Sequence, residues 1–247
     1  MGLSSGLLAS LLCLGFMTQG LADDGIEQCS CAAEHGSFHD HHAMLLDGSR
    51  NVSLAEYRGT TLLVVTVSTY SRWAEQYVGL NALKNKMVNE NGHRFEILGF
   101  PTNNFGLMEP AKNEEILNGI RYVRPGNNYV PNFTMFQKGD CNGENEQSLF
   151  TYLKSCCPHT YWLLGDPERL YWTPIKVSDV RWSFEKFLVD PEGRGVKRVR
   201  PDVTPEDLEP VIDEFIRSWD AAHGGATSGA RSVRDSGLMS WLDDICN

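Results

Sequence analysis

Residues 61–67 read Thr-Leu-Leu-Val-Val-Thr-Val, and this run decides the fold class. Side chains that are apolar or β-branched at every position, rather than at every second one, predict a strand buried on both faces of a sheet. A second such run, residues 95–100, ends at Pro101. Between the two runs, residues 73–90 carry apolar side chains at helical spacing. The three segments therefore predict a strand, a helix and a second strand.

The rest of the chain supplies further elements on either side of this unit. They are a hairpin over residues 38–58 that turns at Asp47-Gly48, helices at 113–121 and 146–156, a strand at 132–136, a hairpin formed by 184–189 and 196–199, and a helix from Thr204 to about Trp219. Thr204 has the character of a helix N-cap, since a proline and two acids follow it. Strands that alternate with helices predict an α/β fold, with a mixed central sheet and helices on both faces.

The composition is that of a globular chain. Of 247 residues, 41% are hydrophobic and 22% are charged, which excludes intrinsic disorder, collagen and coiled coil. The net charge of −10 argues against a protein that binds nucleic acid or an anionic membrane, because both partners require a basic surface. The length suffices for one hydrophobic core with short appendages.

The N-terminus has the pattern of a secretory signal peptide over residues 1–22. This segment carries no charged side chain, its apolar run from Leu7 to Met17 is too short to span a bilayer, and small residues at 20 and 22 precede a cut before Asp23. An N-terminal membrane anchor is the alternative. We expect a secreted, extracellular protein with no membrane span.

The mature chain divides into three parts. Residues 23–37 form an arm that contains cysteines, residues 38–220 form the folded domain, and residues 221–247 form a linker that ends in a short amphipathic helix. The linker is rich in glycine, alanine and serine. The apolar residues of the terminal helix share one face, which predicts packing against the domain or docking to another chain.

Export makes disulfides the expected state of the cysteines. Cys13 leaves with the signal peptide, and the remaining six are Cys29, Cys31, Cys141, Cys156, Cys157 and Cys246. Neither the Cys29-x-Cys31 pair nor the vicinal Cys156-Cys157 pair suits a bond within itself. We expect links between these two clusters or to another chain; a redox pair at Cys156-Cys157 is the alternative.

Two further patterns concern modification and metal binding. Asn51 and Asn132 each begin a glycosylation sequon, the first between turn signals and the second in an apolar strand, where we expect it to be buried. A histidine cluster, His35, His39, His41 and His42, surrounds Asp40. Imidazoles sharing one strand face could bind zinc or copper, but solvated hairpin residues are the more common case, and no metal site is predicted.

Several separated blocks of the chain resemble the glutathione peroxidases, most closely the secreted plasma branch of that family. The blocks are residues 57–59 (YRG), 77–83 (YVGLNAL), 98–106 (LGFPTNNFG), 113–117 (NEEIL), 122–126 (YVRPG), 131–133 (PNF), 139–143 (GDCNG) and 181–189 (RWSFEKFLV). The resemblance extends from about residue 38 to 219. It implies a thioredoxin-like fold and assembly of a homotetramer through residues 124–130.

The resemblance also implies a reaction. Members of the family reduce hydroperoxides: a selenolate or thiolate attacks the O–O bond and becomes a selenenic or sulfenic acid, and two glutathione molecules then restore it. Glutathione is a co-substrate, so no bound cofactor is implied. A glutamine, a tryptophan and an asparagine surround the selenium or sulfur atom and keep it ionised.

At the expected active site this chain departs from the family pattern. The nucleophile position is Ser71, and Arg72 follows it where the family has glycine. The helper glutamine corresponds to Asn104, one C–C bond or roughly 1.5 Å shorter, and the helper asparagine corresponds to Ser183. Only the tryptophan, Trp182, is kept.

These departures predict little or no peroxidase activity. A serine hydroxyl has a pKa far above the roughly 8.5 of a thiol, and its oxygen has no counterpart of the sulfenic acid step. The alternatives are an active enzyme whose residue 71 is natively selenocysteine or cysteine, and a non-catalytic subunit of mixed tetramers. A resolving cysteine is also missing from residues 114–121.

Two cations are candidates for binding glutathione carboxylates. Arg198 and Arg200 fall where the resemblance places cations of that function. The alternative is that both are solvated charges on a basic turn.

Overall fold

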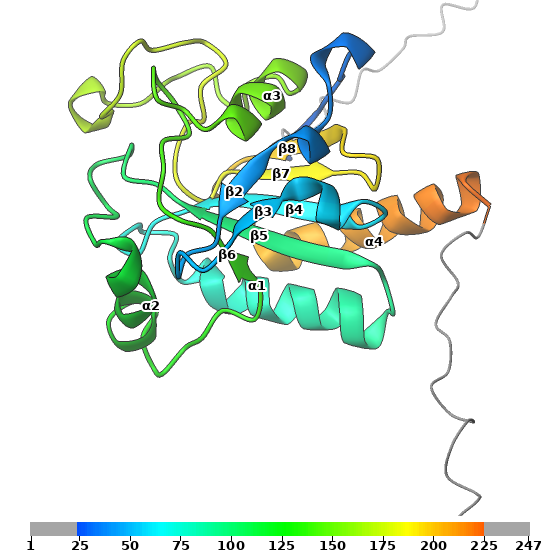
Figure 1. Cartoon of the computed structure of the whole chain (residues 1–247), viewed down its shortest axis with the longest axis horizontal. Coiled ribbons are helices and arrows are strands. Elements are labelled where there is room, and N and C mark those ends of the chain that lie inside the picture. The colour runs from blue at the N-terminus through cyan, green and yellow to red at the C-terminus, as the bar shows by residue number, and fades with distance from the viewer. Residues whose placement is uncertain (1–23, 225–247) are drawn as a thin grey trace, which may run out of the picture.

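The computed structural model describes residues 24–224 (Figure 1). Its strands are β1 (Ile26–Gln28), β2 (His42–Met44), β3 (Asn51–Ser53), β4 (Thr61–Val67), β5 (Phe95–Pro101), β6 (Thr134–Met135), β7 (Lys186–Val189) and β8 (Gly195–Val199). Its α-helices are α1 (Gln76–Asn85), α2 (Asn113–Tyr122), α3 (Ser148–Cys156) and α4 (Pro205–Ala222). The predicted signal peptide lies outside the described residues, as do residues 225–247 of the predicted C-terminal segment; residues 221–222, predicted as the start of the linker, belong to α4.

Six strands form one mixed sheet in the order β1-β8-β7-β4-β5-β6. β4 is parallel to β5 and antiparallel to β7, and β5 is parallel to β6. Every residue of β4 is buried. The run at residues 61–67 is therefore the central strand of an α/β sheet, as its pattern predicts.

Two apolar layers cover the two faces of this sheet. Leu63 and Val65 of β4 face one layer, which includes side chains of α1, α2 and α4. Leu62 and Val64 face the other layer, to which α3 contributes. In Figure 1, α1 and α4 lie on one side of the sheet and α3 lies on the other. The predicted arrangement of helices on both faces is confirmed.

The bounds of several elements differ from those predicted: α1 begins at Gln76 rather than at residue 73, α3 begins at Ser148 rather than at residue 146, and β7 begins at Lys186 rather than at residue 184. α4 begins at the predicted cap, where the Thr204 hydroxyl and the Asp207 carboxylate form a capping box, but it extends past Trp219 to Ala222. Trp219 stacks on His223, 3.9 Å between ring centroids, which extends the last turn. Asn132 is exposed, ahead of a β6 that is shorter than predicted, so the expected burial of this sequon is wrong.

The N-terminal arm is tied to the domain at two places. β1 pairs with β8 at the edge of the sheet. Disulfides join Cys29 to Cys157 and Cys31 to Cys156, so each bond links one cysteine cluster to the other. The expected pairing between clusters is confirmed, and the alternative of a redox pair at Cys156-Cys157 is wrong.

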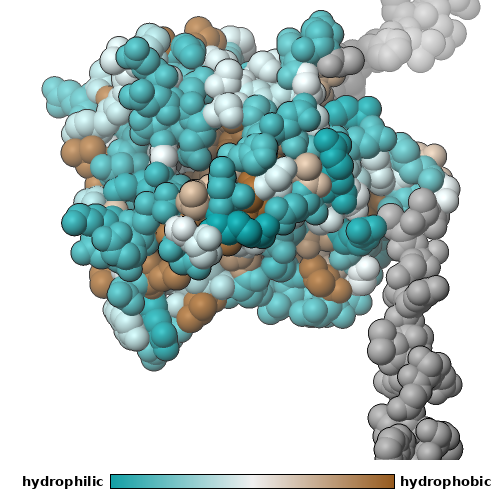
Figure 2. Space-filling view, in the orientation of Figure 1, coloured by the Kyte–Doolittle hydropathy of each residue, from teal (hydrophilic) through white to brown (hydrophobic). Residues whose placement is uncertain are grey.

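The surface fits a protein exposed to water. The face seen in Figure 2 is mainly hydrophilic, with apolar side chains in small separate groups. None of the helices between residues 24 and 224 combines the length and the apolar character that crossing a bilayer requires.

Candidate active site

Ser71 lies in the turn between β4 and α1, just beyond the carboxyl end of the central strand. The Ser71 amide donates to the Ser68 carbonyl (3.2 Å), and the Ala74 amide donates to the Ser71 carbonyl (3.1 Å). Ser68 in turn donates its hydroxyl to the Thr102 carbonyl after β5 (2.7 Å). The turn is thereby fixed to the edge where the parallel strands end, the usual position of sites in α/β sheets.

The Ser71 side chain is 0% exposed and has two donors around it. The Ser183 hydroxyl donates to the Ser71 oxygen at 2.9 Å, and the Trp73 amide donates to it at 3.2 Å. Ser183 comes from the segment that leads into β7, the antiparallel neighbour of β4. The fold therefore brings together two of the residues that the sequence assigned to the site.

Trp182 stands beside this serine pair and is half-buried. Its ring packs against Phe105, with 5.5 Å between ring centroids. The Arg169 guanidinium lies 5.1 Å from the Trp182 ring, within range of a cation–π contact. Trp182 therefore forms a wall of the site and has a cation on its face.

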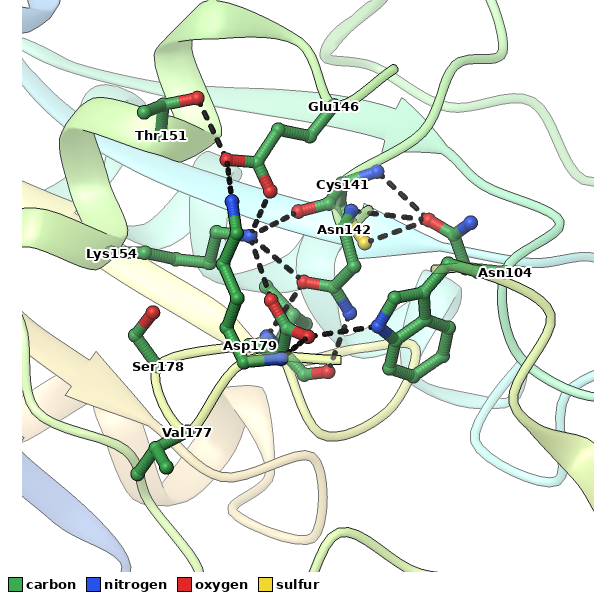
Figure 3. A network of polar contacts seen from close by, with 12 residues as sticks. Asn104, Cys141, Asn142, Glu146, Thr151, Lys154, Val177, Ser178 and Asp179 are labelled. Carbon is green, nitrogen blue, oxygen red and sulfur yellow. Dashed lines mark hydrogen bonds and ion pairs between the residues drawn. The ribbon is translucent and has the colours of Figure 1, made fainter. Parts of the chain in front are cut away.

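Asn104 is buried and directed toward a different partner (Figure 3). Its side-chain oxygen accepts hydrogen bonds from the amides of Cys141 (2.9 Å) and Asn142 (3.3 Å). Its nitrogen donates to the Asp140 carboxylate at 3.1 Å. Among the described residues no hydrogen bond joins Asn104 to Ser71. The Asn104 carboxamide thus stabilises the turn at 140–142 and donates no hydrogen bond to the Ser71 oxygen.

A buried charge network supports that turn from behind. Lys154 forms ion pairs with Glu146 and Asp179, the latter at 3.1 Å, and donates to the Cys141 carbonyl at 3.0 Å. Figure 3 shows these groups converging on the Lys154 nitrogen. Because each buried charge has an opposite partner and further hydrogen bonds, the turn that holds Asn104 is rigid.

Cys141 is the free cysteine within residues 24–224, and it is no substitute nucleophile. Its side chain is fully buried, and that burial raises the pKa of the thiol well above its ordinary value. The thiol donates to the Asn104 oxygen at 3.4 Å. A neutral thiol without access to solvent is a poor nucleophile.

A pocket of about 650 Å³ opens beside the serine pair. Tyr70 and Arg72, the two neighbours of Ser71, line it together with Trp73 and Trp182. Its remaining lining includes the arginines Arg124, Arg169 and Arg181. From the sequence, Arg72 is only a departure from the family pattern and Arg124 only the first residue of the expected assembly segment; no binding role is predicted for any of the four arginines. Arg181 directly precedes Trp182 in the chain, and that adjacency is the signal that could have identified it.

The two cations predicted to bind glutathione have other contacts. Arg198 is 0% exposed, forms an ion pair with Glu185, and donates to the Asp179 carbonyl at 2.8 Å. Neither a ligand contact nor a solvated charge describes this position, because the guanidinium is enclosed by protein. Arg200 is half-buried, pairs with Asp202 at 3.2 Å and lies over the Tyr161 ring.

The histidine cluster does not assemble as a metal site. Residues Phe38–Asp40 form a 3-10 turn rather than a strand, so His39 and His41 do not share a strand face. His39 is buried and its ring contacts the Leu54 carbonyl at 2.9 Å. Between residues 24 and 224 no group of three or more His, Cys, Asp or Glu side chains is placed to hold a metal ion.

Comparison with known proteins identifies relatives over most of the chain. The family model described as glutathione peroxidase matches residues 38–154. Glutathione peroxidase 3 of Mus musculus is 40% identical over 215 residues, which cover 87% of this chain and 94% of that relative. The Bos taurus protein of the same name is 41% identical over 217 residues, covering 87% and 95%. Glutathione peroxidase 6 of Rattus norvegicus is 48% identical over 163 residues, covering 66% and 72%.

Solved structures share the fold. The crystal structure of Trgpx in its apo form has a TM-score of 0.51 and 25% identity, and the match covers 73% of this chain and 95% of that chain. The crystal structure of T. cruzi GPX1 has the same TM-score with 21% identity, covering 73% and 97%. The predicted thioredoxin-like architecture is confirmed.

Proposed function

The chain belongs to the glutathione peroxidase family, and from this membership we propose a secreted member that keeps the fold but has lost most or all of the peroxide-reducing chemistry. The observation that carries the proposal is the Ser71 hydroxyl at the nucleophile position. Its oxygen is enclosed and contacted by the hydroxyl of Ser183 and the amide of Trp73. No imidazole or carboxylate contacts it within the described residues.

The chemistry of oxygen supports the same conclusion. Peroxide reduction in this family needs an atom that is ionised near neutral pH and that accepts an oxygen atom while the O–O bond breaks. A buried serine hydroxyl meets neither condition, because burial disfavours the alkoxide further. The diversion of Asn104 to residues 140–142 removes one of the helper amides from the site.

The test is a coupled assay of glutathione-dependent peroxide reduction on the purified chain. We expect turnover no higher than that of the Trp182→Ala variant, which lacks the one helper that the site retains. Turnover well above that control would overturn the proposal. Intact-mass analysis of protein from its native source separates serine at position 71 from cysteine or selenocysteine, since selenium has a distinct mass and isotope pattern.

The proposal that the protein is secreted is supported by a different set of observations. The two disulfides are typical of proteins that fold in an oxidising compartment, and residues 1–22 have the pattern of a cleaved signal. The test is expression of the full chain in a secretory cell line. We expect protein in the medium whose N-terminal residue is Asp23, whereas retention of residues 1–22 on membranes would support the anchor.

Assembly through residues 124–130 has support from exposed apolar side chains next to that segment. Tyr122 and Val123 are 62% and 60% exposed, and Val130 is also exposed. Clustered apolar side chains on a surface are typical of an interface. We expect the chain to elute as a tetramer in size exclusion with light scattering, and to co-elute with a labelled active homologue if it serves as a non-catalytic subunit. A monomer would contradict both forms of assembly.

A further inference from the structure

Two asparagines of the chain begin glycosylation sequons, and the structure distinguishes between them. Asn51-Val52-Ser53 is strand β3, whereas Asn132-Phe133-Thr134 ends on the first residue of β6. Both asparagines are exposed, so exposure alone does not decide which one can carry a glycan. The contacts of the carboxamide nitrogen and of the sequon hydroxyl decide it, because the modification requires these two groups.

The first sequon presents both of these groups at the surface. Burial alternates along β3: Asn51 is exposed, Val52 is buried and Ser53 is half-buried, so the two polar side chains share the outer face. No hydrogen bond joins the Asn51 carboxamide to another residue between 24 and 224, and the Ser53 hydroxyl caps no helix. Residues 47–50, which precede the sequon, are exposed as well. A sugar on Nδ2 of Asn51 would therefore break no hydrogen bond of the described chain.

Asn132 has the opposite surroundings. Its Nδ2 donates to the Asn81 carbonyl at 3.1 Å and to the Asn85 side-chain oxygen at 3.0 Å. Its backbone is held as well, because the amide donates to the Asn81 side-chain oxygen at 2.9 Å and the carbonyl accepts from Lys84 at 2.9 Å. A primary carboxamide has two N–H donors, and an N-linked sugar replaces one of them. Modification of Asn132 would therefore break a contact that ties this segment to α1.

The other residues of the second sequon belong to the folded core. Phe133 is 7% exposed, and Thr134 pairs with Leu98 of β5 in the main sheet. A sugar on Asn132 would also lie two residues from Val130, at the end of the segment through which we propose that the chain assembles. The first sequon lies instead in the β2–β3 hairpin, which is separate from the six-stranded sheet. Modification of the first sequon therefore leaves the main sheet unchanged.

We propose that Asn51 carries an N-linked glycan and that Asn132 does not. The proposal rests on the proposed secretion, since the chain must enter the compartment in which this transfer takes place. The donor is an oligosaccharide joined through a diphosphate to a polyprenyl lipid. Nδ2 of Asn51 forms a bond to C1 of the terminal sugar and loses one proton. The bond from C1 to the phosphate oxygen breaks, and the lipid diphosphate leaves with that electron pair, so nothing is oxidised or reduced.

A glycan at Asn51 would cover an open strand edge and an exposed apolar side chain. β3 pairs with β2 on one side, and no described strand pairs with its other side. Met44 lies directly opposite Asn51 in this hairpin and is 36% exposed. Side chains of directly opposite residues share one face, so the first sugar would lie next to Met44. Because open strand edges pair with other chains, we expect the bulky polar glycan to reduce nonspecific association through β3.

The test is expression of the full chain in a secretory cell line, followed by intact-mass analysis before and after digestion with peptide N-glycosidase. We expect one glycan per chain, and digestion in water labelled with heavy oxygen should mark position 51 and leave Asn132 unlabelled. Chain in the medium that has no glycan, or has one at Asn132, would overturn this proposal but not secretion. Glycosylated chain retained on membranes would overturn secretion alone, and chain confined to the cytosol would overturn both.

Ser53 offers a matched pair of variants. Ser53→Ala removes the hydroxyl that the sequon requires, and Ser53→Thr keeps it, while Asn51 is unchanged in both. We expect loss of the glycan in Ser53→Ala and its retention in Ser53→Thr and in Asn132→Gln. Each variant is measured in the medium and in the cells, so that a folding defect does not hide the result. A glycan that persists in Ser53→Ala, or that disappears in Asn132→Gln, would overturn the assignment.

Shielding of the β3 edge is tested on one preparation of folded chain, half of it digested and half mock-digested. Digestion leaves an aspartate in place of Asn51, and this added negative charge opposes association of a chain whose net charge is already −10. We nevertheless expect light scattering to grow faster after digestion, because the edge and Met44 are then uncovered. An equal or slower rate would overturn the shielding role.

Discussion

Replacing Ser71 with cysteine should restore only weak peroxidase activity. An ordinary thiol with a pKa of about 8.5 is about 7% ionised at pH 7.4, and each further unit lowers that fraction about tenfold. The side chain at position 71 is enclosed, and enclosure raises the pKa of a thiol. The donors to the Ser71 oxygen are the Ser183 hydroxyl and the Trp73 amide, since Asn104 is bound to residues 140–142.

Restoring the helper side chains should then have a larger effect than the cysteine alone. A hydrogen bond to an ionised group contributes about 1.5–3 kcal/mol, or roughly one to two pKa units per donor. In Ser71→Cys/Asn104→Gln/Ser183→Asn the glutamine is longer by one C–C bond and the new asparagine carries an amide. We expect the thiol pKa to fall by about two units or more relative to Ser71→Cys, and turnover at pH 7.4 to rise about tenfold.

The thiol pKa is measured from the pH dependence of iodoacetamide alkylation, and turnover from a glutathione-coupled peroxide assay. The unmodified chain is the control, because it carries the same cysteines apart from position 71, including the free Cys141, and gives the same background in both measurements. The reasoning is refuted if Ser71→Cys alone has a thiol pKa at or below 7. It is also refuted if Ser71→Cys turns over peroxide as fast as the triple variant does.

Three further predictions concern stability. The two disulfides close loops of 128 and 125 residues, so removing both should lower the free energy of unfolding by about 7 kcal/mol. Cys31→Ser/Cys156→Ser alone should cost only about 2 kcal/mol, because the other bond still closes the long loop; urea titrations would show this difference, and equal losses would contradict it. Burial lowers the pKa of Lys186 from 10.5 to about 7, so between these pH values the unfolded chain binds one more proton than the folded chain. The free energy of unfolding, measured by urea titration at each pH, should therefore rise with pH over this range by up to about 1.4 kcal/mol per pH unit, and Lys186→Met should remove that rise. Burial raises the pKa of Glu109 above 4.5, so the protonated side chain stabilises the fold fully below pH 4.5 and this contribution is lost as the pH rises through the raised pKa. Glu109→Gln should remove this fall in the free energy of unfolding, and a variant with the same pH dependence as the unmodified chain would contradict the prediction.

The layout of the sheet and helices could be predicted because it depends on local patterns. The run at residues 61–67 is apolar on both faces, and only the centre of a sheet accommodates such a strand. Thr204 fixed the start of α4 through its side-chain cap. The end of α4 involves the ring contact between Trp219 and His223, four residues apart, which apolar spacing alone does not reveal, and the exposure of Asn132 depends on where β6 begins in the sheet.

The site could be predicted in part. Ser71 and Ser183 meet, as the motif blocks imply, because β4 and β7 are neighbouring strands. The enclosure of Arg198 was not predictable, since its partner Glu185 lies in another segment and a sequence of alternating arginines resembles a solvated turn. The gathering of Arg72, Arg124, Arg169 and Arg181 around one pocket was not predictable either, because they come from four separate segments of the chain.

The altered residues of the site act together rather than as independent losses. The Ser183 hydroxyl donates to the Ser71 oxygen at 2.9 Å in an enclosed space, where an unpaired hydroxyl would cost about 1–3 kcal/mol. Asn104 satisfies two amides of the 140–142 turn, and the Lys154 network fixes that turn from behind. The hydrogen bonds of Asn104 and Ser183 therefore use side chains at positions that the family pattern directs to the nucleophile. A single exchange at position 71 would therefore introduce a reactive atom into a site whose polar groups are already committed to holding the structure.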